Sequence, residues 1–303
     1  MVWTTVQELA AAVEEPPRQY LVHEQDQGLL AADQMPEPIP LIDLSRLTAD
    51  DEADKLRAAL QTWGLFLIRT LPPRATQSDA SAQLGVVTMA MKKHGDRPPP
   101  SARRCICMLK LLNSSCNCLT LHQHPAHDGD VLLEYASRTK RIRDLVFQSI
   151  AKILDLEEDY FLNQISNKDP GFARFNYYPP CPRPDLVLGM RPHSDGGLLT
   201  IVFVDHDVGG LQVERDGKWY NVPAKPYSLV INLADCMEIM CNGIFRSPVH
   251  RVVTNAEKER LSLAVFYAVD GETMLEPAPG LLDDRRPPRY GKFKAKDFGL
   301  SLD

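Results

Sequence analysis

The chain has 303 residues and a mass of 34.0 kDa, with 44% hydrophobic and 24% charged residues. This composition supports a folded protein with a substantial core and excludes a disordered, collagen-like or coiled-coil chain. The formal net charge of −6 provides no global attraction to nucleic acid or to an anionic membrane. No apolar run approaches the roughly 20 residues that cross a bilayer. We therefore expect neither nucleic acid nor a membrane as a partner.

The first residues and the cysteines indicate the compartment. Residues Met1–Glu15 carry acids and no Lys or Arg, so they match neither a secretory signal nor a transit peptide. The seven cysteines are an odd number, which does not fit a disulfide framework. We expect a reduced, cytoplasmic protein.

The first 70 residues predict four elements. Within one of them Leu56, Ala59 and Leu60 recur at helical spacing, and Gly64 ends the pattern. The four expected elements are a helix over Val2–Val13, a short strand over Ile39–Leu44, a helix over Asp50–Trp63 and a buried strand over Leu65–Ile68.

The segment from Leu71 to Asp130 has a different character. Proline runs interrupt it, it is locally basic, and no amphipathic period persists, so we expect it to be divergent and irregular or poorly ordered. Two helices are predicted after it, over Leu132–Leu154 and Glu157–Ile165.

From Gly171 onward, short apolar runs alternate with Gly, Pro, Asp and Asn at intervals of about ten residues, which is typical of an antiparallel barrel or sandwich. The expected strands are Ala173–Tyr178, Leu186–Pro192, Leu198–Val204, Leu211–Glu214, Lys218–Asn221, Ser228–Asn232, His250–Val253 and Arg260–Ala268. The predicted fold is mostly β with flanking helices around a double-stranded β-helix (jelly-roll) core. We divide the chain into an N-terminal helical or mixed region (1–170), the jelly-roll core (171–270) and a C-terminal tail (271–303) without a clear terminal element.

Within the β region, His193 and Asp195 are two residues apart, so in an extended strand both side chains share one face. His250 lies on a distant strand and could supply a third ligand. Two imidazoles and one carboxylate, with the opposite positions open, form the ligand set of non-haem Fe(II) oxygenases. The alternative for His-x-Asp alone is a polar surface turn.

Arg260 and Ser262 likewise share a face of their strand. A guanidinium grips a carboxylate through two hydrogen bonds, and a neighbouring hydroxyl adds a third. An inward-facing Arg therefore indicates a bound anion such as a dicarboxylate. The alternative is an ion pair with an acid from another strand.

These residues belong to a wider pattern of sequence segments. The segments are NYYPPCPRPDLVLGMRPHSDGGLLTIVFVD, VGGLQV, GKWYNVPA, VINLAD, NGIFRSPVHRV and RLSLAVF. Together they resemble the plant-type iron(II)/2-oxoglutarate-dependent dioxygenase family, in its flavonoid-, alkaloid- and hormone-oxidising branch. The resemblance is close from about Ala173 to Ala268 and weaker before it.

The resemblance implies roles for individual residues. His193, Asp195 and His250 match the iron ligands. The residues that match contacts to 2-oxoglutarate are Arg260, Ser262, Tyr178 and Asn176. Phe266 would stack on an aromatic substrate, although ordinary core packing explains it equally well.

The resemblance also implies an activity. The expected function is hydroxylation, desaturation or demethylation of a small aromatic or polycyclic plant metabolite, a reaction of plant secondary metabolism. The expected cofactors and co-substrates are Fe(II), 2-oxoglutarate and O2, with ascorbate as supporting reductant and with release of succinate and CO2. We expect a monomer, the family default. The individual substrate and the position oxidised are not predicted.

Three departures from the family bear on activity. Arg69-Thr70-Leu71-Pro72-Pro73 stands where relatives have an Asn-His-Gly turn, residues 71–130 lack the family pattern, and the chain ends soon after Lys296-Asp297-Phe298. They suggest a splice or truncation variant. The alternative function is accordingly an inactive variant or paralogue that binds metal and 2-oxoglutarate without turnover.

A competing metal site would lie in the divergent segment, where cysteines and histidines cluster between 105 and 127. Structural zinc sites favour Cys-x2–4-Cys spacing, whereas this segment has Cys105-x-Cys107 and Cys116-x-Cys118, so we favour chance. The remaining Cys and His residues are expected to be structural: Cys181, Cys236 and Cys241 packed in the fold, and His206 in a solvated loop.

Overall fold

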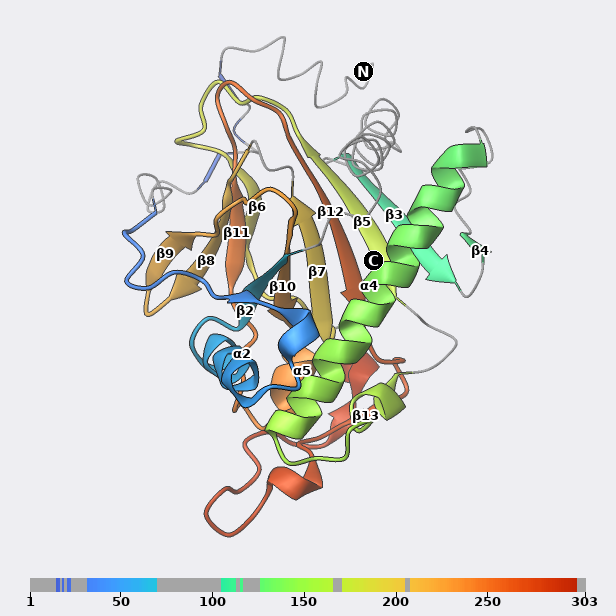
Figure 1. Ribbon diagram of the computed structural model, residues 1–303. Helices are drawn as coiled ribbons and strands as arrows, with labels where there is room; N and C mark the ends of the chain where they lie inside the picture. Colours follow the sequence, from blue (N-terminus) through green and yellow to red (C-terminus); the bar gives the residue numbers. More distant parts are fainter. Residues whose placement is uncertain are drawn as a thin grey trace.

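The computed structural model describes residues 15–16, 18, 21–22, 32–69, 105–112, 115–116, 126–165, 171–204 and 208–298, with backbone alone from 105 to 133. Its centre is a pair of β-sheets that enclose a cavity lined by both, with helices on the outside (Figure 1). Among the described helices, none is long and apolar enough to span a bilayer.

The larger sheet has eight strands and the smaller has four. In spatial order the larger sheet consists of β1 (Leu41–Ile42), β2 (Leu65–Arg69), β10 (Ser228–Leu233), β7 (Leu199–Val204), β12 (Arg260–Tyr267), β5 (Phe172–Tyr178), β3 (Cys105–Leu112) and β4 (Ser115–Cys116). The smaller sheet consists of β6 (Leu188–His193), β11 (His250–Val253), β8 (Leu211–Arg215) and β9 (Lys218–Asn221). Every strand predicted in the β region is present, with ends shifted by at most two residues.

The N-terminal region contributes to the same core. The helix α2 (Asp50–Thr62) begins with three acidic residues, which suit the positive end of a helix dipole, and buries Leu56, Ala59 and Leu60. Gly64, at φ +66°, turns the chain into β2; a Cβ there would lie 2.5 Å from the carbonyl oxygen of Arg246. The predicted helix over 50–63 and strand over 65–68 are therefore confirmed.

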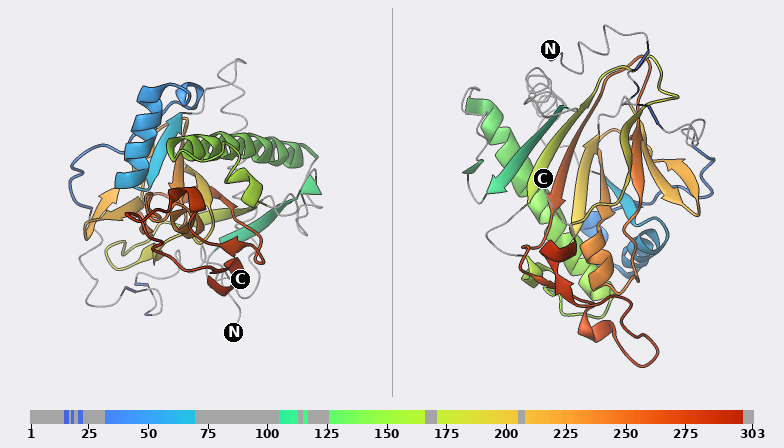
Figure 2. Two further views of the ribbon diagram at one scale, coloured as in Figure 1. Left: turned by 90° about the horizontal axis from the view of Figure 1, so that it is seen from below. Right: turned by 180° about the vertical axis from the view of Figure 1, so that it is seen from behind.

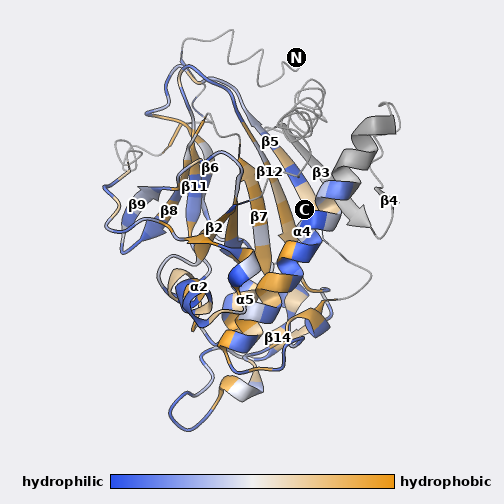
Figure 3. Ribbon diagram, in the orientation of Figure 1, coloured by the Kyte–Doolittle hydropathy of each residue, from blue (hydrophilic) through white to orange (hydrophobic). Residues whose placement is uncertain are grey.

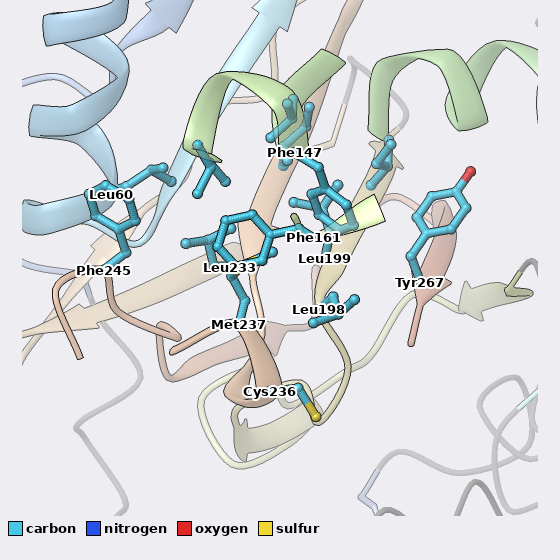
Figure 4. Close-up of a cluster of buried hydrophobic side chains, with 14 of the residues drawn as sticks. Leu60, Phe147, Phe161, Leu198, Leu199, Leu233, Cys236, Met237, Phe245 and Tyr267 are labelled. Atoms are coloured by element: carbon cyan, nitrogen blue, oxygen red, sulfur yellow. The ribbon is translucent and has the colours of Figure 1, made fainter. Parts of the chain in front are cut away.

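The long helix α4 (Ala126–Ile153) lies with α2 along one side of the sheets (Figure 2). Its apolar face buries Val146, Phe147, Ile150 and Ala151, whereas charged residues occupy its outer face (Figure 3). Phe147 meets Phe161 at a ring-centroid distance of 6.3 Å, next to Leu199 and Leu233 (Figure 4). This cluster fixes the outer face of the larger sheet, whose opposite face lines the cavity.

Two predicted helices need correction. The first begins at Ala126 rather than at Leu132. The second, expected over Glu157–Ile165, is replaced by turns and the 3-10 helix η5 (Leu162–Gln164). Tight i→i+3 bonds, such as that from the Tyr160 amide to the Glu157 carbonyl, wind this segment so that Phe161 is fully buried.

The structure also contains elements that the sequence did not predict. Part of the segment expected to be irregular forms β3, which pairs with β5 over six residues and thereby extends the larger sheet beyond residues 171–270. The short helix α5 (Asp235–Met240) follows β10. Four further elements lie in residues 271–298: β13 (Met274–Leu275), η6 (Pro279–Leu281), β14 (Phe293–Lys294) and η7 (Ala295–Phe298).

The tail is accordingly attached to the core and does contain regular elements. Its Leu275, Ala278, Leu281 and Ala295 are buried, and β13 pairs with β14. The sequence predicted no element in the tail, because its small and apolar residues are widely spaced among charged residues and show neither helix nor strand periodicity. The predicted helix over Val2–Val13 lies outside the described residues.

Candidate metal centre

Two histidines meet where the smaller sheet opens into the cavity. His193 ends β6 and His250 begins β11, and the antiparallel pairing of these strands places the two residues opposite each other. Their ring centroids are 4.3 Å apart at an interplanar angle of 52°. Strand register, rather than proximity in sequence, therefore brings the two imidazoles together.

Asp195 completes a three-residue cluster. It lies two residues beyond the end of β6, is only 7% exposed, and places Oδ1 at 3.8 Å from Nε2 of both histidines. The three donor atoms all lie within 4.8 Å of one another. The predicted trio is thus assembled around one point.

Backbone carbonyls determine which ring nitrogen of each imidazole carries a hydrogen. Nδ1 of His193 lies 2.8 Å from the Arg191 carbonyl, and Nδ1 of His250 lies 3.0 Å from the Pro248 carbonyl. Because a carbonyl oxygen only accepts, each Nδ1 carries the hydrogen and donates it. Each Nε2 therefore presents a lone pair toward Oδ1 of Asp195, as a metal-binding histidine requires.

The Asp195 carboxylate is held from its other side. Oδ2 accepts hydrogen bonds from Thr200 Oγ1 (2.6 Å) and Asn232 Nδ2 (2.8 Å), both buried. Burial opposes ionisation of Asp195, but His250 and these two hydrogen bonds outweigh it and hold its pKa below the usual value. Asp195 is therefore a carboxylate with one oxygen left for a ligand.

Burial, followed by the neighbouring His250, lowers the pKa of His193. It is thus a neutral imidazole near pH 7. Two imidazole nitrogens and one carboxylate oxygen fit a divalent transition metal that prefers nitrogen and oxygen donors. The donor chemistry therefore fits Fe(II).

The cavity between the sheets has a volume of about 580 Å³, including space continuous with solvent. Its walls combine the three donors with apolar side chains from both sheets, among them Leu65, Val202, Val230 and Val252. The result is a mostly apolar chamber with a few polar groups, as is usual for small-molecule sites.

The four residues expected to contact a dicarboxylate lie together on β12 and β5. Pairing of these strands places Arg260 opposite Tyr178 and Ser262 opposite Asn176. Arg260 is 3% exposed; its Nε donates to the Gly209 carbonyl (2.9 Å) and its Nη1 to Ser262 Oγ (3.2 Å). Asn176 Nδ2 lies 3.3 Å from the same hydroxyl. A guanidinium, a hydroxyl and an amide thus face the cavity as one carboxylate-binding group.

Phe266 lies where both of its sequence interpretations place it, and its role in stacking on a substrate stays a prediction. It lines the cavity, and its ring also stacks on Phe172 at 4.7 Å between centroids and 10° between planes. The guanidinium carbon of Arg174 lies 5.4 Å from the Phe266 centroid. Phe266 is therefore a cavity wall supported from behind by a second ring.

Three polar residues of the cavity wall were not predicted from the sequence: Arg174, Thr200 and Asn232. For Arg174 a signal was available, because it precedes Asn176 by two residues and therefore shares its face of β5. Thr200 and Asn232 offered none, since each acts through a contact with Asp195 that only the fold creates.

Several other residues are placed away from the centre. Ser194 points to Asp235, to which its hydroxyl donates at 3.0 Å. A Cβ on Gly197 would lie 2.6 Å from the carbonyl oxygen of Tyr267, so close backbone packing requires this glycine.

The prediction that Cys181, Cys236 and Cys241 are packed within the fold is confirmed. Cys181, Cys236 and Cys241 are free and buried; burial raises the pKa of Cys236 to about 12 and also raises that of Cys241, so neither is a reactive thiol. His206 and the side chains of the Cys/His cluster at 105–127 lie outside the described residues.

Comparison with known proteins agrees with this geometry. Residues 171–269 match the model of the 2OG-Fe(II) oxygenase superfamily. The chain is 30% identical over 314 residues to Protein SRG1 of Arabidopsis thaliana, covering 95% of this chain and 87% of that protein. It is 31% identical over 291 residues to codeine O-demethylase of Papaver somniferum, covering 86% and 80%.

A solved structure shares the fold as a whole. The crystal structure of JOX2 in complex with 2OG, Fe and JA superposes with a TM-score of 0.81 at 25% identity, covering 99% of this chain and 93% of that one. This likeness confirms the double-stranded β-helix architecture.

Proposed function

Because this chain belongs to the 2OG-Fe(II) oxygenase superfamily, we propose that it hydroxylates, desaturates or demethylates a small aromatic or polycyclic plant metabolite. It is a 2-oxoglutarate-dependent dioxygenase. The substrate class is our inference, supported by the mostly apolar cavity and by the stacked Phe266 and Phe172.

In this proposal His193, Asp195 and His250 hold the iron. Bound Fe(II) supplies activation of O2, coupled to oxidative decarboxylation of 2-oxoglutarate to succinate and CO2. The protein contributes position and charge: the two Nδ1 hydrogen bonds orient the imidazoles, and Thr200 with Asn232 orients the carboxylate.

Arg260 and Ser262 bind the distal carboxylate of 2-oxoglutarate, with Asn176 supporting the Ser262 hydroxyl. Tyr178, whose ring lies 5.3 Å from the Arg260 guanidinium carbon, borders the same position. Apolar residues of both sheets exclude water from the space in which the organic substrate would lie.

One observation carries the proposal. The three-donor cluster and the buried Arg260 with Ser262 open into the same cavity. A metal site alone fits many functions, whereas a metal site that shares a chamber with a carboxylate-binding Arg fits a keto-acid co-substrate.

The test is succinate release by the full chain supplied with Fe(II), 2-oxoglutarate and ascorbate, with and without a panel of phenolic and polycyclic compounds. We expect release that depends on Asp195 and rises with at least one compound. Tight 2-oxoglutarate binding without any succinate would instead favour the alternative, a binder without turnover.

We further propose that ascorbate sustains turnover by keeping the iron ferrous, and that the protein acts as a monomer in the cytoplasm. The three described free cysteines are compatible with a reducing compartment. Light scattering of the purified chain and imaging of a fluorescent fusion test the last two points.

A further inference from the structure

The short helix α5 contacts both segments of the chain that carry the proposed iron ligands, and it lies next to β13 of the tail (Figure 1). At its start, the Asp235 amide donates to the Asp195 carbonyl (2.8 Å), and the Asp235 carboxylate accepts a 3.0 Å hydrogen bond from Ser194 Oγ. The Cys236 amide donates to the Gly197 carbonyl (3.0 Å). These bonds hold the chain on both sides of Asp195.

The other end of α5 holds the segment that leads to the third ligand. Oε2 of Glu238 accepts a 2.6 Å hydrogen bond from the Ser247 amide. The next residue is the buried Pro248, whose carbonyl accepts the Nδ1 hydrogen of His250 at 3.0 Å. Because proline has no amide hydrogen, Ser247 is the last residue before this carbonyl whose amide a hydrogen bond can hold. Glu238 therefore restrains the group that orients His250.

The second oxygen of the Glu238 carboxylate is held by the C-terminal tail. Oε1 accepts a 2.7 Å hydrogen bond from the Tyr290 hydroxyl. The same part of the tail is attached to Asn242, just beyond α5, whose Oδ1 accepts from the Arg289 amide (2.7 Å) and whose Nδ2 donates to the Pro287 carbonyl (3.1 Å). Backbone contacts of its own segment thus place Tyr290 against Glu238.

The two contacts of Glu238 indicate more than stabilisation of its own helix. Its donors lie 9 and 52 residues away in the sequence, one beside a proposed ligand and the other in the tail. Hydrogen bonds to a carboxylate are about twice as strong as those between neutral groups. A carboxylate that served α5 alone would need neither donor. The contacts form a continuous path from Tyr290 through Glu238 to the carbonyl that orients His250.

We propose that Glu238 and Tyr290 are positioning residues of the metal centre. Glu238 holds the segment before His250 so that the ring keeps its Nε2 directed at the metal, and Tyr290 holds Glu238. The tail is accordingly part of the support of the metal site. This inference rests on the proposed function, since it assumes that His250 binds the metal.

The test measures metal binding by the full chain with the metal alone. Calorimetric titration with Mn(II) gives the affinity, and the visible absorption of the Co(II)-loaded protein reports the ligand geometry, which lost stability alone would not change. E238A should weaken Mn(II) binding about tenfold, the lower end of the effect of losing an outer contact. It should also alter the Co(II) spectrum.

Two milder variants assign the effect to the hydrogen bonds. E238Q keeps an oxygen for the Ser247 amide, so it should bind Mn(II) within about threefold of the wild type and keep the wild-type Co(II) spectrum. Y290F loses only the hydroxyl, and it should weaken Mn(II) binding about threefold and shift the spectrum in the same direction as E238A.

Val146→Ala provides the matched control for lost stability. Val146 is 0% exposed on α4 and is not one of the residues in this path of contacts. This variant should unfold at lower urea concentration but keep the wild-type Mn(II) affinity and Co(II) spectrum. A V146A protein that loses as much metal affinity as E238A would overturn the inference, because loss of stability would then explain both.

The remaining outcomes separate this inference from the proposed function. If E238A and Y290F both bind Mn(II) within twofold of the wild type and leave the Co(II) spectrum unaltered, the inference is overturned while the proposed function stands. If E238A fails to fold, Y290F decides the question by the same two measurements. A wild-type chain that binds neither Mn(II) nor Co(II) would contradict the proposed function itself and this inference with it.

Discussion

Asn232 donates a 2.8 Å hydrogen bond to Oδ2 of Asp195 and so reserves Oδ1 of this carboxylate for the point where both histidine Nε2 atoms converge. Asn232 lies on β10 of the larger sheet, whereas Asp195 follows β6 of the smaller sheet. One side chain therefore ties the ligand geometry to the packing of the two sheets.

Replacing Asn232 with Ala should weaken metal binding by roughly 10–100-fold, because outer contacts of this kind orient the ligands. Calorimetric titration of the metal-free protein with Mn(II) measures the effect. Asn221→Ala, on the exposed face of β9, is the control and should bind Mn(II) like the wild type. An N232A affinity within twofold of the wild type would show that Asp195 needs no such restraint.

Arg260→Lys should lower the affinity for 2-oxoglutarate about tenfold or more, which corresponds to about 1.4 kcal/mol. Lysine presents a point charge and cannot reproduce the planar fork that also bonds Gly209 and Ser262. Binding of 2-oxoglutarate to the Mn(II)-loaded protein is the measurement. Affinity for Mn(II) alone is the internal control and should not change; an unaltered 2-oxoglutarate affinity would remove Arg260 from the site.

Two residues of the helix α4, one buried and one exposed, provide a matched test of how this helix packs against the core. Phe147 is 0% exposed, whereas Leu145, two residues earlier, is 45% exposed. We expect Phe147→Ala to lower the free energy of unfolding by about 3–5 kcal/mol through lost burial and a cavity. Leu145→Ala should change it by less than about 0.5 kcal/mol. Urea unfolding measures both, and similar effects would mean that α4 does not pack as described.

Tyr267 should make the protein sensitive to alkali. Burial raises its pKa to about 12, and its hydroxyl lies 3.0 Å from Thr139 Oγ1. A group whose pKa is higher in the folded state stabilises that state below its unfolded pKa, near 10, and loses this contribution as the pH rises toward 12. Between pH 8 and pH 11 the wild type should lose about 1.4 kcal/mol more stability than Tyr267→Phe. Equal losses in urea unfolding at the two pH values would contradict the assigned burial.

Much of the β architecture was predictable from the sequence, because its signals are local. Alternating apolar residues and regularly spaced turn residues located β5 to β12, and alternation along β12 placed Arg260 beside Ser262. The two-residue spacing of His193 and Asp195 predicted the right pair, although Asp195 lies two residues beyond the end of β6. The partnership with His250 could be inferred only from chemistry and the family pattern, since strand pairing creates it.

The elements that were missed lack such signals. The helix α5 has six residues and lies between apolar runs, so neither length nor period distinguishes it from a strand. The strand β3 lies in a segment whose proline-rich flanks suggested irregular structure, and long-range pairing with β5 makes it a strand. In the tail, β13 and β14 have two residues each and exist through their pairing.

The central claim is that His193, Asp195 and His250 bind one ferrous ion. Equilibrium dialysis of the metal-free chain against Fe(II) under anaerobic conditions tests it most directly. The account predicts one iron per wild-type chain and none in the triple variant in which all three residues are Ala, with 2-oxoglutarate tightening iron retention in the wild type alone. A triple variant that binds iron as tightly as the wild type would contradict it.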